Sequence, residues 1–184
     1  MTEREAKILA AAGQVFSLYG FKRATMNDIA TEAGVARQTL YNSFANKEEV
    51  MLGCMRAFMV QQVSTIQAGA EACNQAAAVL DIILEAVSLK PYRMLAQSRH
   101  ADEIMDGYSR FPAEEKAENS RQLIAVIEQV LQPYRQAEQD DGLTLNALAE
   151  FIYSSAYAAK HNALDEAHLM TLLNTLKLLV LKGL

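Results

Sequence analysis

The sequence predicts an all-α protein. Its 184 residues include only three prolines and eight glycines, so long stretches run without a helix breaker. These stretches are rich in Ala, Leu, Glu, Gln and Met, which favour helices. No sustained alternation of Val, Ile and Thr with polar residues, the pattern of a half-buried strand, competes with them. A chain of this length can bury a sizeable core.

Apolar periodicity and end signals divide the chain into successive helices. The first is expected from Glu3 to Tyr19, because apolar residues recur on one face and Gly20 follows as a stop. A short second helix starts after Thr25, which can form a capping box with Asp28, and ends at Gly34. Further helices are expected over residues 37–44, 47–67, 74–88, 92–108 (with Pro91 at the start), 113–139, 143–161 and 165–182.

Charge is distributed unevenly along the chain. The formal net charge is -5, yet residues 1–50 hold equal numbers of basic and acidic residues, so the deficit lies in the rest. A neutral head on an acidic body is compatible with a nucleic-acid partner if the basic residues of the head share one face.

The stretch 26–44 has the spacing of a helix-turn-helix. Ala30 is the small residue needed where two helices cross, and Gly34, four residues later, allows a sharp turn. The apolar residues that would lock the second helix onto the first are Ile29, Val35 and Leu40. In this arrangement the second helix projects from the surface, where it can enter the major groove of DNA.

With its flanks, this stretch resembles the TetR family. The resemblance covers residues 4 to 55 and is carried by Gly20-Phe21, Thr25, Asp28-Ile29-Ala30, Ala33-Gly34-Val35, Thr39-Leu40-Tyr41, Phe44 and Lys47-Glu48-Glu49. Beyond residue 55 only the architecture matches. The resemblance implies an N-terminal three-helix DNA-binding domain over residues 1–47 and a C-terminal helical ligand-binding and dimerisation domain over residues 48–184.

The resemblance also implies roles for individual residues at the DNA. Thr25, Thr39, Tyr41 and Lys47 would contact backbone phosphates, which position the protein without reading sequence. Arg37, Gln38, Asn42 and Ser43 would occupy the exposed positions of the recognition helix, with Arg37 suited to guanine and Gln38 or Asn42 to adenine. Taken singly, Tyr41 could equally be a core residue and Lys47 a solvated cation. Ala36 departs from the family, which often has a capping Ser there; a lost cap costs about 1 kcal/mol.

The last two helices are expected to form a dimer interface. The apolar face of the final helix is too wide for a helix that packs on one side only. Two such helices from each subunit would make a four-helix interface, as the resemblance also implies. The residues assigned to it are Phe151, Ile152, Leu169, Leu172, Leu173, Leu176 and Val180. The alternative is that this face is buried within one subunit.

The middle helices are expected to bind a small molecule, as family members commonly do. Apolar and aromatic walls with a few polar groups suit a mainly apolar or aromatic ligand. The residues assigned to this site are Phe58, Met59, Met94, Met105, Tyr108, Tyr153 and Tyr157, with Arg93, Gln97 and His100 as polar groups. Arg93 or His100 would meet an acidic group of the ligand. The alternative for each residue is an ordinary core position.

Together these observations predict a one-component transcriptional repressor. It would bind a palindromic operator as a homodimer and be released by a small-molecule effector. The alternative is a helical interaction module whose helix-turn-helix docks a protein partner.

Other classes of protein are not expected. No nucleophile with its base, paired carboxylates or phosphate loop indicates an enzyme. No cofactor is expected, and no metal, because the histidines lack ligand spacing. Cys54 and Cys73 are expected to be reduced and buried in a cytoplasmic protein, with no redox role. No secretory signal or membrane span is expected.

Overall fold

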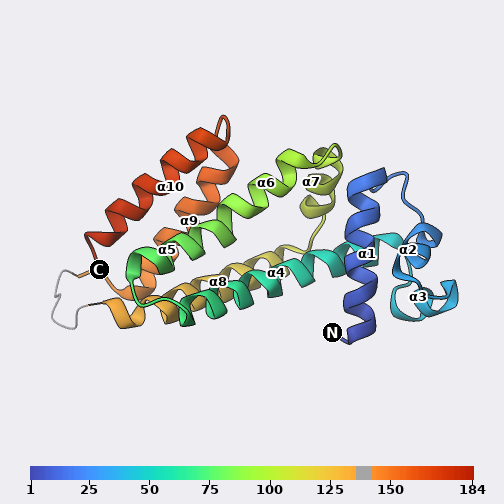
Figure 1. Cartoon of the computed structure of the whole chain (residues 1–184), viewed down its shortest axis with the longest axis horizontal. Helices are drawn as coiled ribbons and strands as arrows, with labels where there is room; N and C mark the ends of the chain where they lie inside the picture. The colour runs from blue at the N-terminus through green and yellow to red at the C-terminus, as the bar shows by residue number, and fades with distance from the viewer. Residues whose placement is uncertain (136–141) are drawn as a thin grey trace. The chain divides into compact units, whose positions relative to one another are not determined.

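The computed structural model describes residues 1–135 and 142–184, and every regular element within these ranges is a helix (Figure 1). The all-α prediction is therefore confirmed. By their internal packing the described residues form two compact units. The first comprises Met1–Val60 and Leu95–Ala113, and the second Gln61–Met94 and Glu114–Leu184. These are units of packing, whereas the boundary expected after residue 47 divides the chain by function.

The first unit contains α1 (Glu3–Tyr19), α2 (Met26–Ala33), α3 (Arg37–Ser43), the start of α4 (Lys47–Glu71) and α7 (Ala101–Ser109). Thr2 and Glu5 form a capping box at the start of α1, which satisfies two backbone N–H groups there. Apolar residues of α1, α2, α3 and α4 meet in one core, which includes Ile8, Ala12, Phe16, Ile29, Leu40 and Val50.

The second unit contains the rest of α4, from Gln61, and the helices that remain. These are α5 (Ala76–Leu84), the π-helix η1 (Glu85–Leu89), α6 (Lys90–Gln97), α8 (Ala113–Leu131), the 3-10 helix η2 (Gln132–Tyr134), α9 (Leu145–Asn162) and α10 (Glu166–Leu181). Of these, α6 passes into the first unit after Met94. Its core includes Ile66, Leu80, Ile83, Ile127, Ile152 and Leu169. None of the described helices combines the length and apolar character that a membrane crossing requires.

The middle of the chain differs from the expected helices. The helix expected over 74–88 continues through η1 into α6, and the one expected over 92–108 is two helices, α6 and α7. Pro91 therefore lies inside a helical run. In a π-turn, the carbonyl of Ala86 would accept from residue 91, but proline has no N–H. Gln62 of α4 fills that place, because its Nε2 donates to the Ala86 carbonyl at 2.8 Å.

Most other boundaries lie within a few residues of expectation, with α4 extending to Glu71. The helix expected over 113–139 is shorter: α8 ends at Leu131 and the 3-10 helix Gln132–Tyr134 follows, because Pro133 cannot continue an α-helix. Residues 136–139 of the helix expected over 113–139 lie outside the described residues. Side chains cap both C-terminal helices: Thr144 accepts from the N–H of Ala147, and Asp165 from that of His168.

Candidate nucleic-acid interface and sensing region

The turn between α2 and α3 has the geometry that the sequence predicts. Gly34 ends α2 in the left-handed conformation, with φ 61° and ψ 38°, which favours glycine. The N–H of Val35 donates to the carbonyl of Ala30 at 3.0 Å, closing the turn. Leu40 is 0% exposed and fixes α3 on the core. At Ala36 no side chain caps α3, as the sequence predicts.

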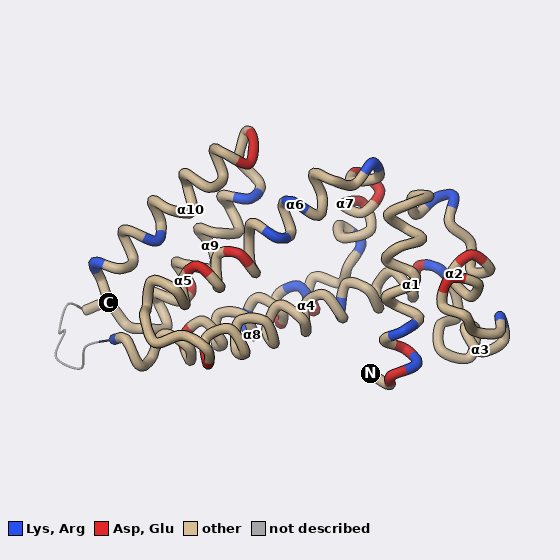
Figure 2. The backbone as a smooth tube through the Cα atoms, viewed as in Figure 1, with Lys and Arg blue, Asp and Glu red and all other residues tan. Residues whose placement is uncertain are grey.

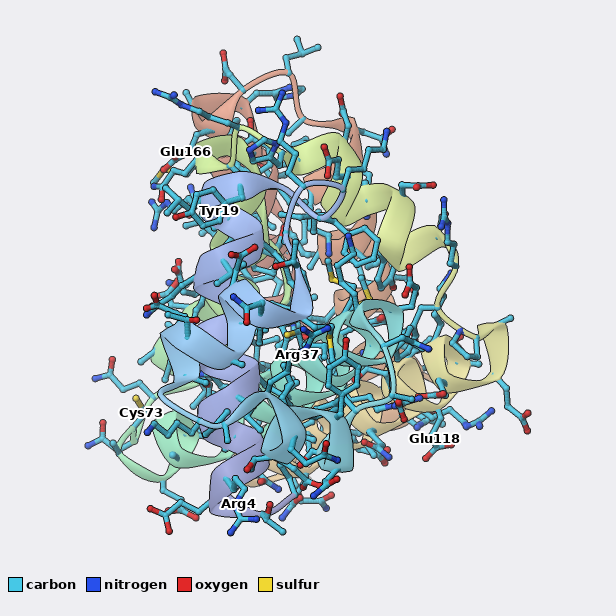
Figure 3. The ribbon with its side chains drawn as sticks, turned by 90° about the vertical axis from the view of Figure 1, so that its right-hand side faces the viewer. Arg4, Tyr19, Arg37, Cys73, Glu118 and Glu166 are labelled. Atoms are coloured by element: carbon cyan, nitrogen blue, oxygen red, sulfur yellow. The ribbon has the colours of Figure 1, made fainter. Side chains whose placement is uncertain are left out.

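The exposed side of α3 carries the residues expected to read DNA. Arg37, Gln38, Tyr41 and Asn42 are exposed, and Arg37 lies at the front of the view in Figure 3. Arg37 Nη2 lies 3.5 Å from the Tyr41 hydroxyl, and Gln38 Nε2 donates to Asn42 Oδ1 at 3.0 Å. The two residues of each pair are one helical turn apart, and the pairs preorganise the polar surface of α3. Arg37 is the one charged residue of α3, so the helix is basic (Figure 2).

Thr39 and Ser43 are less accessible than the sequence suggested. Both are half-buried, and the Ser43 hydroxyl lies 3.5 Å from the Thr39 carbonyl, directed back at its own helix. Tyr41 is partly exposed and does not belong to the buried core. The structure thus brings Arg37, Gln38, Tyr41 and Asn42 onto one accessible surface, with Thr39 and Ser43 at its edge.

Thr25 caps α2. Its hydroxyl donates to Asp28 Oδ2 at 2.6 Å, and the N–H of Asp28 donates to the Thr25 hydroxyl at 3.2 Å. Hydrogen bonds from the side chain and backbone of Thr25 lower the pKa of the Asp28 carboxyl. Because the first N–H groups of any helix lack an acceptor within it, the backbone of Met26 and Asn27 adds donors at this point. Sequence reasoning named the Thr25 side chain and missed these backbone donors.

Lys47 holds the loop between α1 and α2. Its ammonium donates to the carbonyls of Lys22 at 3.2 Å and Ala24 at 2.9 Å, and lies 4.6 Å from the centre of the Phe21 ring. A lysine ammonium has three N–H donors, so one remains for a phosphate. The sequence offered no signal for this bridge, because it joins residues more than 20 positions apart.

The same loop is bound from α7. Glu103 Oε2 accepts from the N–H of Lys22 at 2.7 Å, and His100 Nδ1 lies 3.8 Å from Glu103 Oε1. Gly20, at φ 78°, lies directly against the His100 ring. His100, which was expected to meet the ligand, thus packs against the loop between α1 and α2.

The residues assigned to the ligand site are divided between the two units. Those in the first unit are Phe58, Met59, Gln97, His100, Met105 and Tyr108, and those in the second are Arg93, Met94, Tyr153 and Tyr157. Arg93 is occupied by ion pairs, with Glu166 at 2.7 Å and Glu85 at 3.6 Å. Tyr153 and Tyr157 do meet, with ring centres 6.1 Å apart.

A groove between α5, η1 and α10 was not anticipated. Its volume is about 500 Å³, and an ion pair between Lys177 and Asp81, at 2.6 Å, lies among its walls. The lining residues are Asp81, Leu84, Glu85, Leu89, Met170, Thr171, Leu173, Asn174, Thr175 and Lys177. None of the residues assigned to the ligand lines this groove.

The assigned interface residues face in two directions. Ile152, Leu169, Leu173, Leu176 and Val180 are buried in the core of their own protomer. Of the assigned residues, Phe151 is 53% exposed and Leu172 is half-buried. The large apolar side chains exposed on α10 are Met170, Leu178 and Leu179. Because a helix with a wide apolar stripe buries one part of it against its own body, only the remaining part is open to a second copy.

Neither cysteine forms a disulfide. Burial raises the pKa of the Cys54 thiol to about 12, and Cys54 Sγ lies 3.5 Å from the Leu9 carbonyl. Among residues 1–135 and 142–184, no group of three or more His, Cys, Asp or Glu side chains is arranged to hold a metal ion.

Comparison with known proteins gives the same assignment for the head. Residues 8–54 match the family described as bacterial regulatory proteins, tetR family. The HTH-type transcriptional activator FasR of Mycolicibacterium smegmatis is 35% identical over 35% of this chain and 30% of its own length. The uncharacterized HTH-type transcriptional regulator YezE of Bacillus subtilis is 27% identical over 45% of this chain and 43% of its own length. The matches thus span less than half of these relatives.

Solved structures resemble the fold over nearly the whole chain. A TetR-family transcriptional regulator from Pectobacterium atrosepticum aligns with a TM-score of 0.69 and 22% identity, over 99% of this chain and 94% of that one. The fatty acid degradation regulator FadR from Bacillus halodurans aligns with a TM-score of 0.63 and 22% identity, over 100% and 97%. The helix-turn-helix geometry and the match over residues 8–54 lead to one conclusion: the head is that of the tetR family of bacterial regulatory proteins, on a chain with the fold of solved TetR-family regulators.

Proposed function

We propose that this protein is a one-component repressor that binds palindromic DNA as a homodimer and is released by a small-molecule effector. In this proposal residues 1–47 bind DNA, and residues 48–184 sense the effector and dimerise. The observation that carries it is the contrast within α3. Leu40 is fully buried in the head, while the polar side chains of Arg37, Gln38 and Asn42 remain exposed and uncommitted to the core.

The contacts divide by chemistry. Arg37 would pair with guanine, and Gln38 or Asn42 with adenine, each discriminating by about 1–3 kcal/mol. Tyr41, Thr39 and Ser43 would meet phosphates along the edge of α3, and the remaining N–H of Lys47 would do the same at the start of α4. At α2 the phosphate would meet the N–H groups of Met26 and Asn27, since a helix N-terminus attracts anions. The Thr25 hydroxyl, which donates to Asp28 in the free protein, would turn to donate to the phosphate.

A second copy would pack against the outward surfaces of α9 and α10. Phe151, Met170, Leu178 and Leu179 are exposed there. Leu172 would join them at the edge, while the five buried residues of the assigned interface support these helices from behind. Two recognition helices related by a two-fold axis would read half-sites one DNA turn apart.

Similar proteins support regulation by a ligand, but they do not decide whether this chain represses or activates transcription. The FadR of Bacillus subtilis has been solved in complex with stearoyl-CoA, and it shares the fold with a TM-score of 0.54. Among sequence relatives, FasR is named an activator and KstR2 of Mycobacterium tuberculosis a repressor. Release of this chain from its operator requires that the effector bind the DNA-free form more tightly than the DNA-bound form.

The test begins with selection of operator DNA from a random pool, followed by fluorescence anisotropy on the selected site. Arg37→Ala should relax the preference at one base of each half-site. Arg121→Ala removes an exposed arginine of α8, paired with Glu118, and should leave binding unchanged. Failure to enrich any sequence, or equal behaviour of the two variants, would contradict the proposed function.

A further inference from the structure

One face of α9 carries a column of rings beside a lysine. The ring centres of Tyr153 and Tyr157 are 6.1 Å apart, and those of Tyr157 and His161 are 4.6 Å apart. The ammonium of Lys160 lies over the Tyr157 ring, 4.4 Å from its centre. We call Tyr153, Tyr157, Lys160 and His161 the α9 cluster. It supplies one cation and a flat, largely apolar surface next to it.

Lys160 has no counter-ion in the part of the chain that the structure describes. Its ammonium lies over the Tyr157 ring, and the side chain is half-buried. Burial lowers the pKa of the Lys160 ammonium to about 8, and no carboxylate acts against this shift. The pKa of His161 is lowered by burial and by the charge of Lys160. The local charge is therefore positive and uncompensated.

Other cations of the same unit contrast with Lys160. Arg93 pairs with Glu166 at 2.7 Å, Lys177 with Asp81 at 2.6 Å, and Arg121 with Glu118 at 2.6 Å. A desolvated charge without a partner costs stability. A neighbouring helix supplies the carboxylate to Arg93 and to Lys177, and α8 itself supplies it to Arg121, so the absence of one beside Lys160 calls for a reason.

The helix end explains only part of this arrangement. Lys160 and His161 lie in the last turn of α9, where positive charge interacts well with the helix dipole. A lysine in that role needs no burial and can remain in water. The side chain that bonds the last turn is Asn162, whose Nδ2 donates to the Ala158 carbonyl at 2.8 Å. The dipole accounts for the sign of the charge but not for its desolvation over a ring.

The facing turn of α8 is also incompletely bonded. The hydroxyls of Ser120 and Tyr153 lie 2.9 Å apart, which links α8 to α9 at this cluster. The preceding residue, Asn119, has an Oδ1 atom that is shielded from solvent and lacks a hydrogen-bond partner within the described ranges. An acceptor of this kind calls for a donor and not for an anion, so the contact that ties α8 to the α9 cluster is the one between Ser120 and Tyr153.

We propose that the α9 cluster binds an organic anion, with its carboxylate or sulfonate on Lys160 and its aromatic or apolar body against Tyr157 and Tyr153. Such a ligand would neutralise the one cation that the protein leaves unpaired here. The sequence analysis assigned the acidic group to Arg93 or His100, but both are engaged elsewhere. The assignment of this anion as the effector rests on the proposed function, whereas its binding does not.

The test uses a matched pair of fluorescent probes and the whole protein. 8-Anilinonaphthalene-1-sulfonate carries the anion, and N-phenyl-1-naphthylamine has the same rings without it. Lys160→Met keeps the length of the side chain and removes the charge, and Lys182→Met does the same at an exposed lysine. We expect Lys160→Met to weaken sulfonate binding at least tenfold and to leave the neutral probe unchanged, while Lys182→Met behaves as wild type.

The stability and the operator binding of Lys160→Met distinguish an anion-binding lysine from a purely structural one. Because an unpaired cation is removed, the urea midpoint of Lys160→Met should be equal to or higher than that of the wild type. A lower midpoint with unchanged sulfonate affinity would show a purely structural lysine and overturn the proposal. Failure of the sulfonate to bind the wild type would also overturn it. Operator binding by Lys160→Met, measured without probe, should equal that of the wild type, so loss of the anion site and loss of the DNA-binding function are separate results.

Discussion

Gly20 gives a prediction whose size follows from its surroundings. It joins α1 to the loop before α2 with φ 78° and ψ 158°, a conformation that residues with a Cβ rarely adopt and that costs them about 1–3 kcal/mol. A Cβ placed there would lie 2.7 Å from His100 Nδ1 and 3.0 Å from Glu103 Oε2. Forcing apart such contacts typically costs a further ~1–3 kcal/mol. Gly20→Ala should therefore destabilise the protein by about 2–6 kcal/mol.

Two other glycines serve as matched controls. Gly34→Ala keeps a positive φ of 61° but meets nothing closer than 3.7 Å, so only the backbone cost of about 1–2 kcal/mol applies. Gly13 lies exposed within α1 with no atom within 4 Å of an added Cβ. Gly13→Ala should therefore stabilise by about 0.5–1 kcal/mol.

Urea unfolding of the three variants, followed by far-UV circular dichroism with a common slope, measures these differences. Adding His100→Ala to Gly20→Ala should recover the steric part of the loss and leave the backbone part. A Gly20→Ala variant no less stable than Gly34→Ala would refute the proposed packing of α7 on this loop.

Three further predictions concern other sites. Lys47→Ala should weaken operator binding about equally across sequences and reduce the magnitude of the salt slope by about 1 per half-site, in anisotropy titrations at several salt concentrations; an unchanged slope would mean that the ammonium serves only the loop. Leu178→Glu should give folded monomers in sedimentation velocity because Leu178 is 54% exposed, whereas Leu173→Glu should unfold the body; a Leu178→Glu dimer would place the interface elsewhere. Burial disfavours the thiolate of Cys54 and raises the pKa of the thiol to about 12. At pH 8, peptide mass spectrometry should therefore show that Cys54 is alkylated more slowly than the free amino acid cysteine, and an equal rate would contradict the burial.

The head was predictable because its signals are local. The capping box of Thr25 and Asp28, and the turn at Gly34, depend on residues three or four positions apart. The bridges of Lys47 and Glu103 to the α1–α2 loop join residues 23 to 81 positions apart, and no periodicity encodes them. They emerge only when the helices are packed.

The body was less predictable for a related reason. The wide apolar stripe on α10 predicts that part of it packs within the protomer, but it does not tell which part. Leu173 and Leu178 look alike in sequence, yet one is buried and the other exposed. The ion pairs of Arg93 could not be predicted either. Arg93 was expected to be open to a ligand, but it forms ion pairs with Glu166 and Glu85.

The π-turn of η1 makes the length of this segment critical. It places one extra residue in a helical run that continues from α5 into α6. Deleting a single residue there would restore ordinary α-helical spacing without breaking the run. Everything after the deletion would then rotate by about 100° about the helix axis relative to α5. Arg93 would turn away from Glu166 and Glu85, and Pro91 would no longer be matched to the donor from Gln62. Deleting one residue here would thus rotate the side chains of α6 about the helix axis. Other side chains of α6 would then face the core, while the path of the backbone would stay almost unchanged.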